Sequence, residues 1–343
     1  MTHIAYPAGF VPPHRLTGLS PSTPILIGFS GGADSTALLL ALAAYAALHH
    51  TPLYALHLHH GIRGTDADRD ADFCRQTAQA AKIPFTLIHA DVPAYAKEHG
   101  LSLETAGREL RHDCFAALMR EKEIPILTLA HHADDHMETV LYRLLRGTGA
   151  KGLCGIPPVR PFSESGVLIR PLLHCRKEDL LTYLEVRGQA YCTDITNAED
   201  DCDRNRIRHH LVPVLRTLSE HPEERFLRLS DTLREDCAAL DLLAAQAYRA
   251  AGTGNGALSA TALREYPAAI RKRVYIIWLS DMGLPAPEAI HLHALDQAVA
   301  ARNRTARIAL PGRAFALFDG SAPDLLILQR NDPMPDNGRK STV

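Results

Sequence analysis

Between residues 24 and 149, short apolar runs alternate with longer amphipathic segments. The runs PILIGFS, LYALHLHH, PFTLIHAD and PILTLAHH are short and end in polar residues, a pattern typical of buried strands. The segments that separate or follow them predict helices, over residues 35–49, 66–82, 104–121 and 134–146. Strands and helices in strict turn imply right-handed crossovers and a parallel sheet covered on both faces. We therefore predict an α/β fold with a Rossmann-like parallel sheet.

After residue 149 this alternation ends. The segments RKEDLLTYLEVRG and RNRIRHHLVPVL predict helices, and LIRPLL is short and extended. Residues 217–302 are mostly helical in pattern, and residues 305–329 suggest two or three short strands. We expect a first domain over residues 1–215, a mostly helical second domain over residues 216–330 and a frayed polar tail over residues 331–343.

Composition and charge narrow the class of protein. The chain has 343 residues and a formal net charge of −2, so binding to a polyanion would depend on local basic patches. Its seven cysteines include no C-x-x-C pair, which favours a reducing compartment and argues against disulfides and a zinc or iron–sulfur site. The first residues lack a signal-peptide pattern, and the apolar run over residues 37–48 is too short to span a bilayer. We expect a cytoplasmic protein with no membrane partner.

Polar clusters follow three of the predicted strands. They are SGGADS, HLHHGIR and AHHADD. The carboxyl ends of parallel strands meet at one edge of a sheet, where α/β proteins bind their ligands. We therefore expect the three clusters to converge on one site.

The cluster SGGADS has the features of an anion-binding loop. Gly31 and Gly32 permit positive φ and the close approach of a ligand, and the helix that follows offers free N–H groups. Ser30 and Ser35 add hydroxyl donors. Asp34 would repel phosphate unless a hard cation such as Mg²⁺ lay between them. The lysine of a Walker A motif and the pattern G-x-G-x-x-G are both absent, and the alternative is a plain glycine turn capped by serine.

Acidic residues head the predicted helix after the third cluster. Asp134, Asp135 and Glu138 lie in its first turns, and the last two share a face. The helix dipole favours acids there, so simple capping is one interpretation. Because Asp34 lies in the facing loop, we favour a Mg²⁺ site formed by Asp34 and Asp135.

Histidines and arginines near the same edge leave alternatives open. His131 and His132 are metal ligands, contacts to a phosphate or base, or packed side chains. Arg108 and Arg111 are one turn apart on a predicted helix. They either form a planar fork for phosphate or belong to a solvated helix face.

Two basic runs contain no acidic residue. Residues 139–163 include Arg143, Arg146, Lys151 and Arg160, and residues 204–219 include Arg204, Arg206, Arg208 and Arg216. A nearly neutral chain needs such runs to bind RNA phosphates. A single run is usually plain surface, but two runs that flank a nucleotide site favour RNA.

These motifs resemble known families. The loop SGGADS resembles the pyrophosphate-binding loop of the N-type ATP pyrophosphatases, which adenylate a substrate and release pyrophosphate. Four further blocks resemble the tRNA(Ile)-lysidine synthetase family: HLHHGIRGTDADRDADFC, LETAGRELRHDCF, LAHHADDHMETVLYRLLRGTGAKGLCGIPP and YCTDITNAEDDCDRNRIRHHLVPVL. They occur in the order of that family and cover most of residues 24–215.

The resemblance implies an activity. Enzymes of that family use ATP and Mg²⁺ to adenylate the C2 oxygen of the wobble cytidine in an isoleucine tRNA with a CAU anticodon. The ε-amine of free L-lysine then displaces AMP and gives lysidine. The second domain would help to recognise the tRNA. Longer members carry a further C-terminal domain, and this chain is expected to stop before one.

The resemblance also implies roles for single residues. The catalytic set is Asp34, Asp135, Arg108 and Arg111, with Asp34 and Asp135 on Mg²⁺. The expected ATP contacts are Ser30, Gly31, Gly32, Ala33, Asp34, Ser35, His57, His60, Arg63 and His131. The expected RNA contacts are Arg143, Arg146, Lys151, Arg204, Asn205 and Arg208. The chain departs from the family pattern E-x-x-A-R-x-x-R-Y at Gly107, which follows Ala106, and at His112, which stands where tyrosine is usual.

Two other functions and the oligomeric state are left open. Thiolation of a tRNA base would use the same adenylating chemistry, but thiolation enzymes with this loop usually hold a cysteine pair, and no C-x-x-C is present. A non-catalytic nucleotide sensor that binds RNA would keep the glycines but has little use for the acids. A homodimer is compatible with the sequence.

Overall fold

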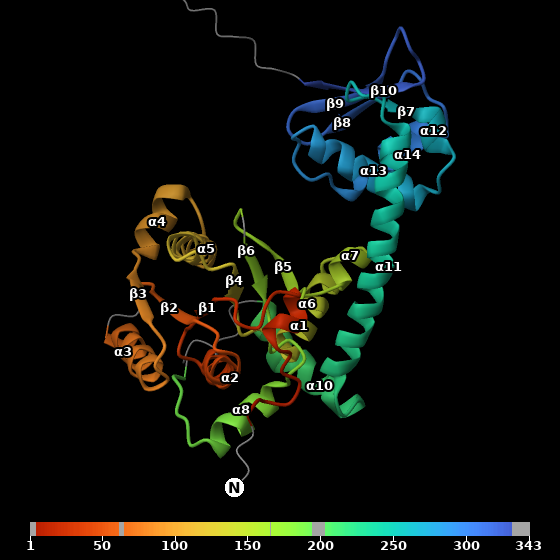
Figure 1. Cartoon of the computed structure of the whole chain (residues 1–343). Helices are drawn as coiled ribbons and strands as arrows, with labels where there is room; N and C mark the ends of the chain where they lie inside the picture. Colours follow the sequence, from red (N-terminus) through yellow and green to blue (C-terminus); the bar gives the residue numbers. More distant parts are fainter. Residues whose placement is uncertain (1–4, 62–64, 165, 194–202, 331–343) are drawn as a thin grey trace, which may run out of the picture. The chain divides into compact units, whose positions relative to one another are not determined.

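The computed structural model describes residues 5–61, 65–164, 166–193 and 203–330 (Figure 1). The chain divides into two compact units, Met1–Leu233 and Arg234–Val343. Helix α11 (Pro222–Ala251) contributes residues to both units. The functional boundary predicted at residue 215 stays a prediction, and the predicted tail over residues 331–343 lies outside the described residues. No helix in the described part of the chain has the length and apolar character needed to cross a membrane.

A six-stranded sheet forms the centre of the first unit. Its strands are β1 (Ile25–Gly28), β2 (Leu53–His59), β3 (Phe85–His89), β4 (Ile126–Thr128), β5 (Val159–Phe162) and β6 (Gly166–Ile169). Their order is β3-β2-β1-β4-β6-β5, and all neighbours are parallel except β5, which pairs antiparallel with β6. The predicted Rossmann-like α/β fold is confirmed.

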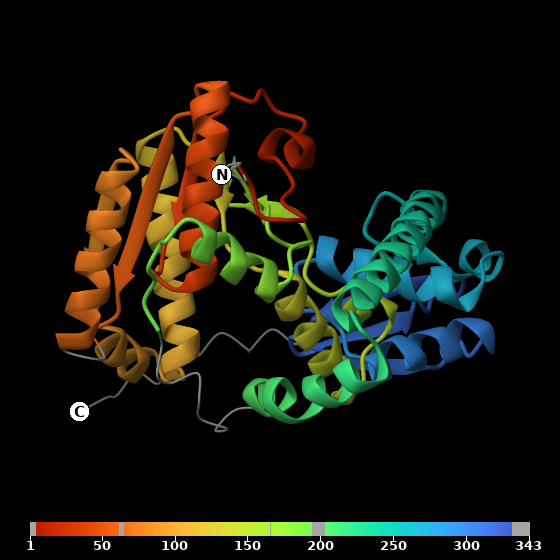
Figure 2. The same cartoon turned by 90° about the horizontal axis from the view of Figure 1, so that it is seen from below.

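Helices cover both faces of this sheet (Figures 1 and 2). One face carries α1 (Pro13–Thr17), α2 (Ala33–His49), α3 (Thr65–Ala80) and α8 (Lys177–Val186), and the other carries α4 (Val92–His99) and α5 (Leu103–Glu121). Because successive side chains of a strand point to opposite faces, β1 contributes Ile25 and Ile27 to one core and Leu26 to the other. Burial on both faces explains the continuous apolar sequence of β1.

A helical region is built from segments that lie before β5 and after β6 in the chain. It comprises α6 (Ala133–Leu145), α7 (Ala150–Leu153), α9 (Asp203–Arg206), a π-helical turn η2 (Ile207–Leu211) and α10 (Val212–Leu218). Met137 and Leu141 of α6 pack against Ile207 and Val212. This apolar contact brings the second basic run onto the helix that begins with the acidic cluster.

The second unit combines helices with an antiparallel sheet. After the end of α11 come β7 (Leu258–Ser259), α12 (Ala260–Arg264), α13 (Ala268–Asp281) and α14 (Ala289–Ala300), and then β8 (Arg307–Leu310), β9 (Ala314–Phe318) and β10 (Leu325–Arg330). The sheet order is β7-β10-β9-β8. Trp278 is fully buried in this core, and its Nε1 donates a hydrogen bond of 2.7 Å to the Gly256 carbonyl oxygen. The predicted helices and the strands within residues 305–329 are confirmed.

Several described elements escaped the sequence pattern, among them the short helices α1 and α7. Helix α4 lies between β3 and α5, where strict alternation leaves no place for it. Strand β5 pairs with β6 through a short hairpin, and its segment VRPF has no clear periodicity. Strand β7 has only two residues, too few for any periodic signal.

Candidate active site

The loop between β1 and α2 is fixed by one glycine and one hydroxyl group. Gly31 has a φ of 87°, and a Cβ at this position would lie 3.0 Å from Sγ of Cys74 and 3.3 Å from Sγ of Cys192. Oγ of Ser35 accepts a hydrogen bond from the Gly31 N–H at 3.1 Å and donates one to the Gly32 carbonyl oxygen at 3.0 Å. Buried Ser35 therefore shapes the loop, whereas Ser30 is exposed.

The start of α2 offers backbone donors to an anion. Gly32 is the residue before the helix, with extended backbone, and no side chain in the described structure caps the first turn from this position. The N–H groups of a first helical turn have no partner within the helix and carry the positive end of its dipole. The loop geometry therefore suits a phosphate group next to Ser30, Gly32 and Ala33.

The histidines at the end of β2 contact the end of β1 and helix α5. Nδ1 of His57 lies 2.9 Å from the Phe29 carbonyl oxygen, and burial lowers the pKa of this ring, so a neutral His57 supports the strand end before the loop. Nε2 of His60 lies 3.3 Å from Nη2 of Arg111. Arg63 lies outside the described residues. Contacts of these residues to ATP stay predictions.

Three carboxylates converge on His132. Its Nε2 lies 3.6 Å from Asp34 and 3.5 Å from Asp135, and its Nδ1 lies 3.3 Å from Asp134. The Asp34 and Asp135 oxygens that approach Nε2 are therefore no more than about 7 Å apart. Asp135 also accepts a hydrogen bond of 3.1 Å from the His132 N–H and so caps α6. We call His132 and these three carboxylates the acid cluster.

The charges of the acid cluster stabilise one another. Burial favours the neutral histidine, but Asp135, Asp134 and Asp34 outweigh it and raise the pKa of His132 to about 10. Burial likewise opposes the charge of Asp34, but His132 and Lys177 lower its pKa to about 2. The pKa of Asp134 is also about 2, because His132 and the Lys177 N–H outweigh burial. At neutral pH a cationic His132 thus lies next to the ionised carboxylates of Asp34 and Asp134.

Two further cations reach the acid cluster. Nζ of Lys177 lies 2.6 Å from Oδ1 of Asp34, and Arg216 lies 2.5 Å from Oδ1 of Asp134. The backbone N–H of Lys177 also donates to Asp134 at 2.8 Å. Lys177 was not predicted as a site residue. Its partner Asp34 lies 143 residues earlier, and no sequence spacing connects the two.

The second basic run pairs with the acidic face of α6. Arg208 forks onto buried Glu138 with hydrogen bonds of 2.7 and 2.8 Å and lies 3.7 Å from Asp135. Arg204 donates to Thr139 at 2.6 Å and lies 3.7 Å from Glu138. The run contains no acid in sequence, but its acids come from α6 in space. The predicted RNA contacts of Arg204, Arg208 and half-buried Asn205 stay predictions.

The first basic run has other partners. Nη1 of Arg143 donates to the carbonyl oxygens of Gly152 and Gly155, both at 3.0 Å, and so closes the turn around α7. Arg146 is exposed and donates to the Tyr142 hydroxyl at 2.7 Å. Lys151 is exposed on α7. The predicted RNA contacts of Arg143, Arg146 and Lys151 stay predictions.

The acid cluster suits a metal ion that arrives with its own ligands. Mg²⁺ is usually bound by one or two carboxylates together with phosphate oxygens and water. Within the described part of the chain, no group of three or more His, Cys, Asp and Glu side chains could hold a metal. Asp34 and Asp135 can supply two carboxylates, so the donor set fits Mg²⁺ only in company with a phosphate ligand.

Four arginines on the other side of this edge lack an acidic partner. Arg108 and Arg111 lie on the exposed face of α5, Arg160 lies on β5, and Arg170 directly follows β6. None of the four forms an ion pair with a carboxylate in the described structure. We call them the arginine cluster.

Arg170 connects this cluster to the histidines after β4. Its Nε donates to Nδ1 of His131 at 3.3 Å, and its Nη1 donates to the Pro157 carbonyl oxygen at 2.6 Å. Burial lowers the pKa of His131 to about 4, so this ring is neutral. Arg170 was not among the predicted site residues. It lies within the segment LIRPLL, directly after the last residue of β6, and so at the same sheet edge as the other clusters.

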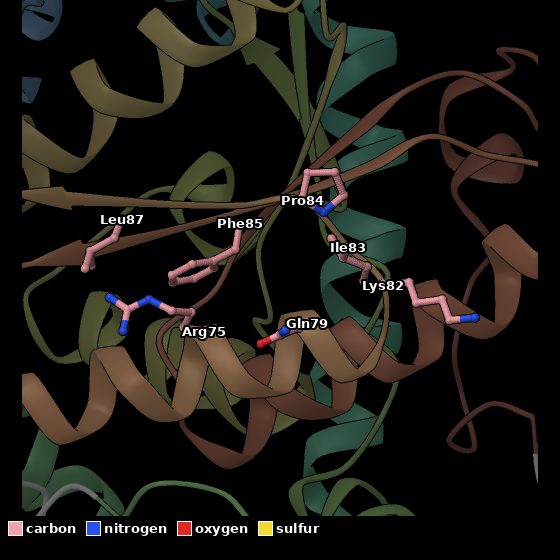
Figure 3. A pocket seen from close by; sticks show the side chains of 7 residues that line it. All are labelled: Arg75, Gln79, Lys82, Ile83, Pro84, Phe85 and Leu87. Carbon is pink, nitrogen blue, oxygen red and sulfur yellow. The ribbon is translucent and has the colours of Figure 1, made fainter.

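A cavity of about 460 Å³ lies elsewhere in the first unit (Figure 3). Its lining comprises Arg75, Gln79, Lys82, Ile83, Pro84, Phe85 and Leu87. It surrounds the first half of edge strand β3, whereas the loop and both charged clusters follow the carboxyl ends of the strands. We assign the site to the charged edge, because the cavity contains no acid, histidine or phosphate-binding loop.

Comparison with known proteins agrees with this geometry. Residues 13–215 match a family model described as a PP-loop domain, and residues 258–322 match one described as the TilS substrate binding domain. The first match contains the loop and both charged clusters, and the second begins at β7.

Curated relatives extend the likeness over most of the chain. The tRNA(Ile)-lysidine synthase of Geobacter sulfurreducens is 36% identical over 85% of this chain and 62% of its own length. That of Bacillus licheniformis is 41% identical over 62% of this chain and 44% of its own length. The chain thus spans about half the length of these relatives. Among solved structures, the U34-tRNA thiolase NcsA from Methanococcus maripaludis has a TM-score of 0.53 at 18% identity, over 62% of this chain and 73% of that chain, a likeness of fold alone.

Proposed function

The chain belongs to the PP-loop domain family, and from this premise we propose that it joins lysine to C2 of the wobble cytidine in an isoleucine tRNA with a CAU anticodon. The reaction would consume ATP and yield lysidine, AMP and pyrophosphate through an adenylated RNA. The relatives named tRNA(Ile)-lysidine synthase and the match to the TilS substrate binding domain support this reaction over other chemistries of the fold.

One observation carries the proposal. Asp34 of the loop and Asp135 of α6 approach the same nitrogen of His132, at 3.6 and 3.5 Å. His132 and Lys177 compensate these acids within the fold, but the acids would still repel a phosphate in the facing loop unless a hard cation such as Mg²⁺ lay between them. When bound there, Mg²⁺ would neutralise charge on the phosphates that Asp34 and Asp135 help to hold.

The first step would activate the base. The C2 oxygen of cytidine attacks the α-phosphorus of ATP, and the bond from this phosphorus to the pyrophosphate oxygen breaks. The first-turn N–H groups of α2 and the hydroxyl of Ser30 would hold the departing pyrophosphate. This step is needed because a carbonyl oxygen leaves poorly, whereas the oxygen of an AMP ester leaves readily.

The second step would form the new bond. The ε-amine of lysine attacks C2, the bond from C2 to the AMP oxygen breaks, and AMP leaves. Free lysine has a pKa near 10.4 in water, so the site must accept a proton before or during the attack. A single-stranded anticodon loop suits the site, because its bases can turn outward into a pocket.

A labelling experiment tests the proposal. Purified chain is mixed with ATP, Mg²⁺, radiolabelled lysine and a transcript of the CAU-anticodon tRNA. We expect label in the RNA, dependent on ATP, and none in a transcript with uridine at the wobble position. Pyrophosphate release without label in the RNA would contradict the proposal.

Thiolation is the weaker candidate. The fold brings Cys74 and Cys192 together beneath Gly31, a pair that the missing C-x-x-C spacing concealed. Burial raises the pKa of both thiols, that of Cys192 to about 12, so neither supplies a thiolate at neutral pH. Mass spectrometry of the product separates the two reactions, because lysine and sulfur add very different masses.

A further inference from the structure

Arg170 is a buried charge with no counter-ion among the residues that the structure describes. The residue is 7% exposed, and burial, together with Arg160 and Arg108, lowers its pKa to about 10. Its two described hydrogen bonds, to the His131 ring and the Pro157 carbonyl, are both to neutral acceptors. Burying a guanidinium without a carboxylate is unfavourable, so the fold keeps this charge at a cost to its own stability.

The guanidinium still has free donors. Of its five N–H groups, two are used, and the others have no partner in the described structure. Neither described hydrogen bond of Arg170 involves Nη2, so both of its N–H groups can donate to a ligand. A planar group with free donors at the carboxyl edge of the sheet is suited to a phosphate.

The second unit contains an informative contrast. The side chain of Arg271 is only 12% exposed, and Arg271 forks onto Asp296 with hydrogen bonds of 2.7 and 3.1 Å. Its charge is thus compensated within the fold. Arg271 shows how this chain buries an arginine for structure, and Arg170 does not follow that arrangement.

We propose that Arg170 forms the floor of a second phosphate-binding site, separate from the loop at Gly31, with Arg160 and Arg108 at its sides. The ligand would be a phosphate group of the RNA substrate or of the bound nucleotide. The RNA source rests on the proposed function. Arg170 lies after β6 and the loop follows β1, with β4 between them, so the two sites would hold different phosphates.

The test uses the full chain with three substitutions. Arg170→Met removes the charge at similar volume, Arg170→Lys keeps the charge but loses the fork, and Arg271→Met is the matched control. The first measurement is the melting temperature without ligand. We expect Arg170→Met to melt at or above the wild-type temperature, because it removes an uncompensated charge, and Arg271→Met to melt lower, because it leaves Asp296 unpaired.

The second measurement is ligand affinity at several salt concentrations. ATP and an anticodon stem-loop with CAU are titrated separately. If the phosphate belongs to RNA, Arg170→Met weakens RNA binding about tenfold or more, reduces the slope of log affinity against log salt by about one, and leaves ATP affinity unchanged. If it belongs to the nucleotide, ATP affinity falls instead. Arg170→Lys should keep the salt slope and lose only part of the affinity.

Two results would overturn the site. If Arg170→Met binds ATP and RNA with wild-type affinity, Arg170 is a structural residue. The same conclusion follows if both affinities are kept and the melting temperature falls as much as in Arg271→Met. If Arg170→Met fails to fold, wild-type affinities in Arg170→Lys count against the site in the same way. A wild-type chain that binds no RNA would contradict the proposed function, and the ATP titration would then decide the arginine site alone.

Discussion

The two sides of the sheet edge hold charge in opposite ways. In the acid cluster, Asp34 contacts both His132 and Lys177, and Asp134 contacts both His132 and Arg216. In the arginine cluster, none of the four cations has a carboxylate partner among the described residues. The charges of the paired side are compensated within the fold, whereas the unpaired side carries positive charge that no described carboxylate compensates.

This difference shows what local charge can hide. The formal net charge of −2 gives no sign of a concentrated positive site. Acid-free runs in the sequence are also a poor guide to free cations, because Arg208 is paired with Glu138 and Arg216 with Asp134. Arg170, a cation without a described carboxylate partner, lies outside both acid-free runs.

The largest expected effect concerns the paired side. Asp34→Asn should lower the rate of pyrophosphate release by about 100- to 1,000-fold, because the loop loses one of the two carboxylates that face the phosphates. Pyrophosphate release with ATP, lysine and RNA at saturation measures this. Asp113→Asn, an exposed acid on α5, is the control and should keep the wild-type rate. A rate within about twofold of wild type in Asp34→Asn would remove Asp34 from the chemistry.

The next effect is a dependence of stability on pH. The pKa of His132 is raised from 6.5 to about 10 in the folded protein, so its contribution is complete below pH 6.5 and is lost as pH rises through about 10. We expect the free energy of unfolding to fall by a few kcal/mol over this interval, measured by urea denaturation in EDTA. His132→Gln should flatten the curve. An equally steep curve in the variant would place the titration elsewhere.

Acid should act through the partners of the same histidine. The pKa values of Asp34 and Asp134 are lowered from 3.8 to about 2, so the stability they supply is present above pH 3.8 and is lost as pH falls through about 2. Urea denaturation between pH 5 and the lowest accessible pH measures this loss. Asp134→Asn should reduce it, and a loss unchanged in that variant would contradict the pairing.

A smaller effect is expected from breaking one pair on α6. Glu138→Gln should reduce the free energy of unfolding by about 2 kcal/mol, because it leaves Arg208 with a weaker partner. The double variant Glu138→Gln with Arg208→Met should recover part of this loss, since no cation then remains uncompensated. A loss in the double variant equal to the sum of the losses in the two single variants would show that the two residues act independently.

The smallest effect on stability belongs to the unpaired side. Arg108→Gln lies on an exposed face and should change the free energy of unfolding by less than about 0.5 kcal/mol. Its effect should appear only in RNA or nucleotide affinity and in the dependence of that affinity on salt. A clear loss of stability would mean that Arg108 has a structural partner.

The sequence predicted the scaffold better than the contacts. The strands that precede Ser30, His60 and His131 were predicted because apolar runs identify buried strands. Parallel topology then places the ends of these strands together. Asp34 and Asp135 were paired on this basis, and the fold brings both to His132. Topology thus predicts which residues meet at one edge of the sheet.

The contacts between single side chains at this edge could not be predicted from the sequence. Lys177 reaches Asp34 from a helix 143 residues away, and Arg216 reaches Asp134 from 82 residues away, distances that no periodicity encodes. Arg170 is informative only through its burial and the absence of an acid in the described surroundings, both of which are properties of the folded chain.

The rate of pyrophosphate release as a function of RNA concentration tests most directly whether the two sides divide the work. We predict that Asp135→Asn lowers kcat and leaves the KM for RNA within about twofold. Arg170→Met should preserve kcat and raise about tenfold the KM for RNA, or the KM for ATP if its phosphate belongs to the nucleotide. A raised KM in Asp135→Asn together with a lowered kcat in Arg170→Met would contradict the division between an acid side that serves chemistry and an arginine side that binds phosphate.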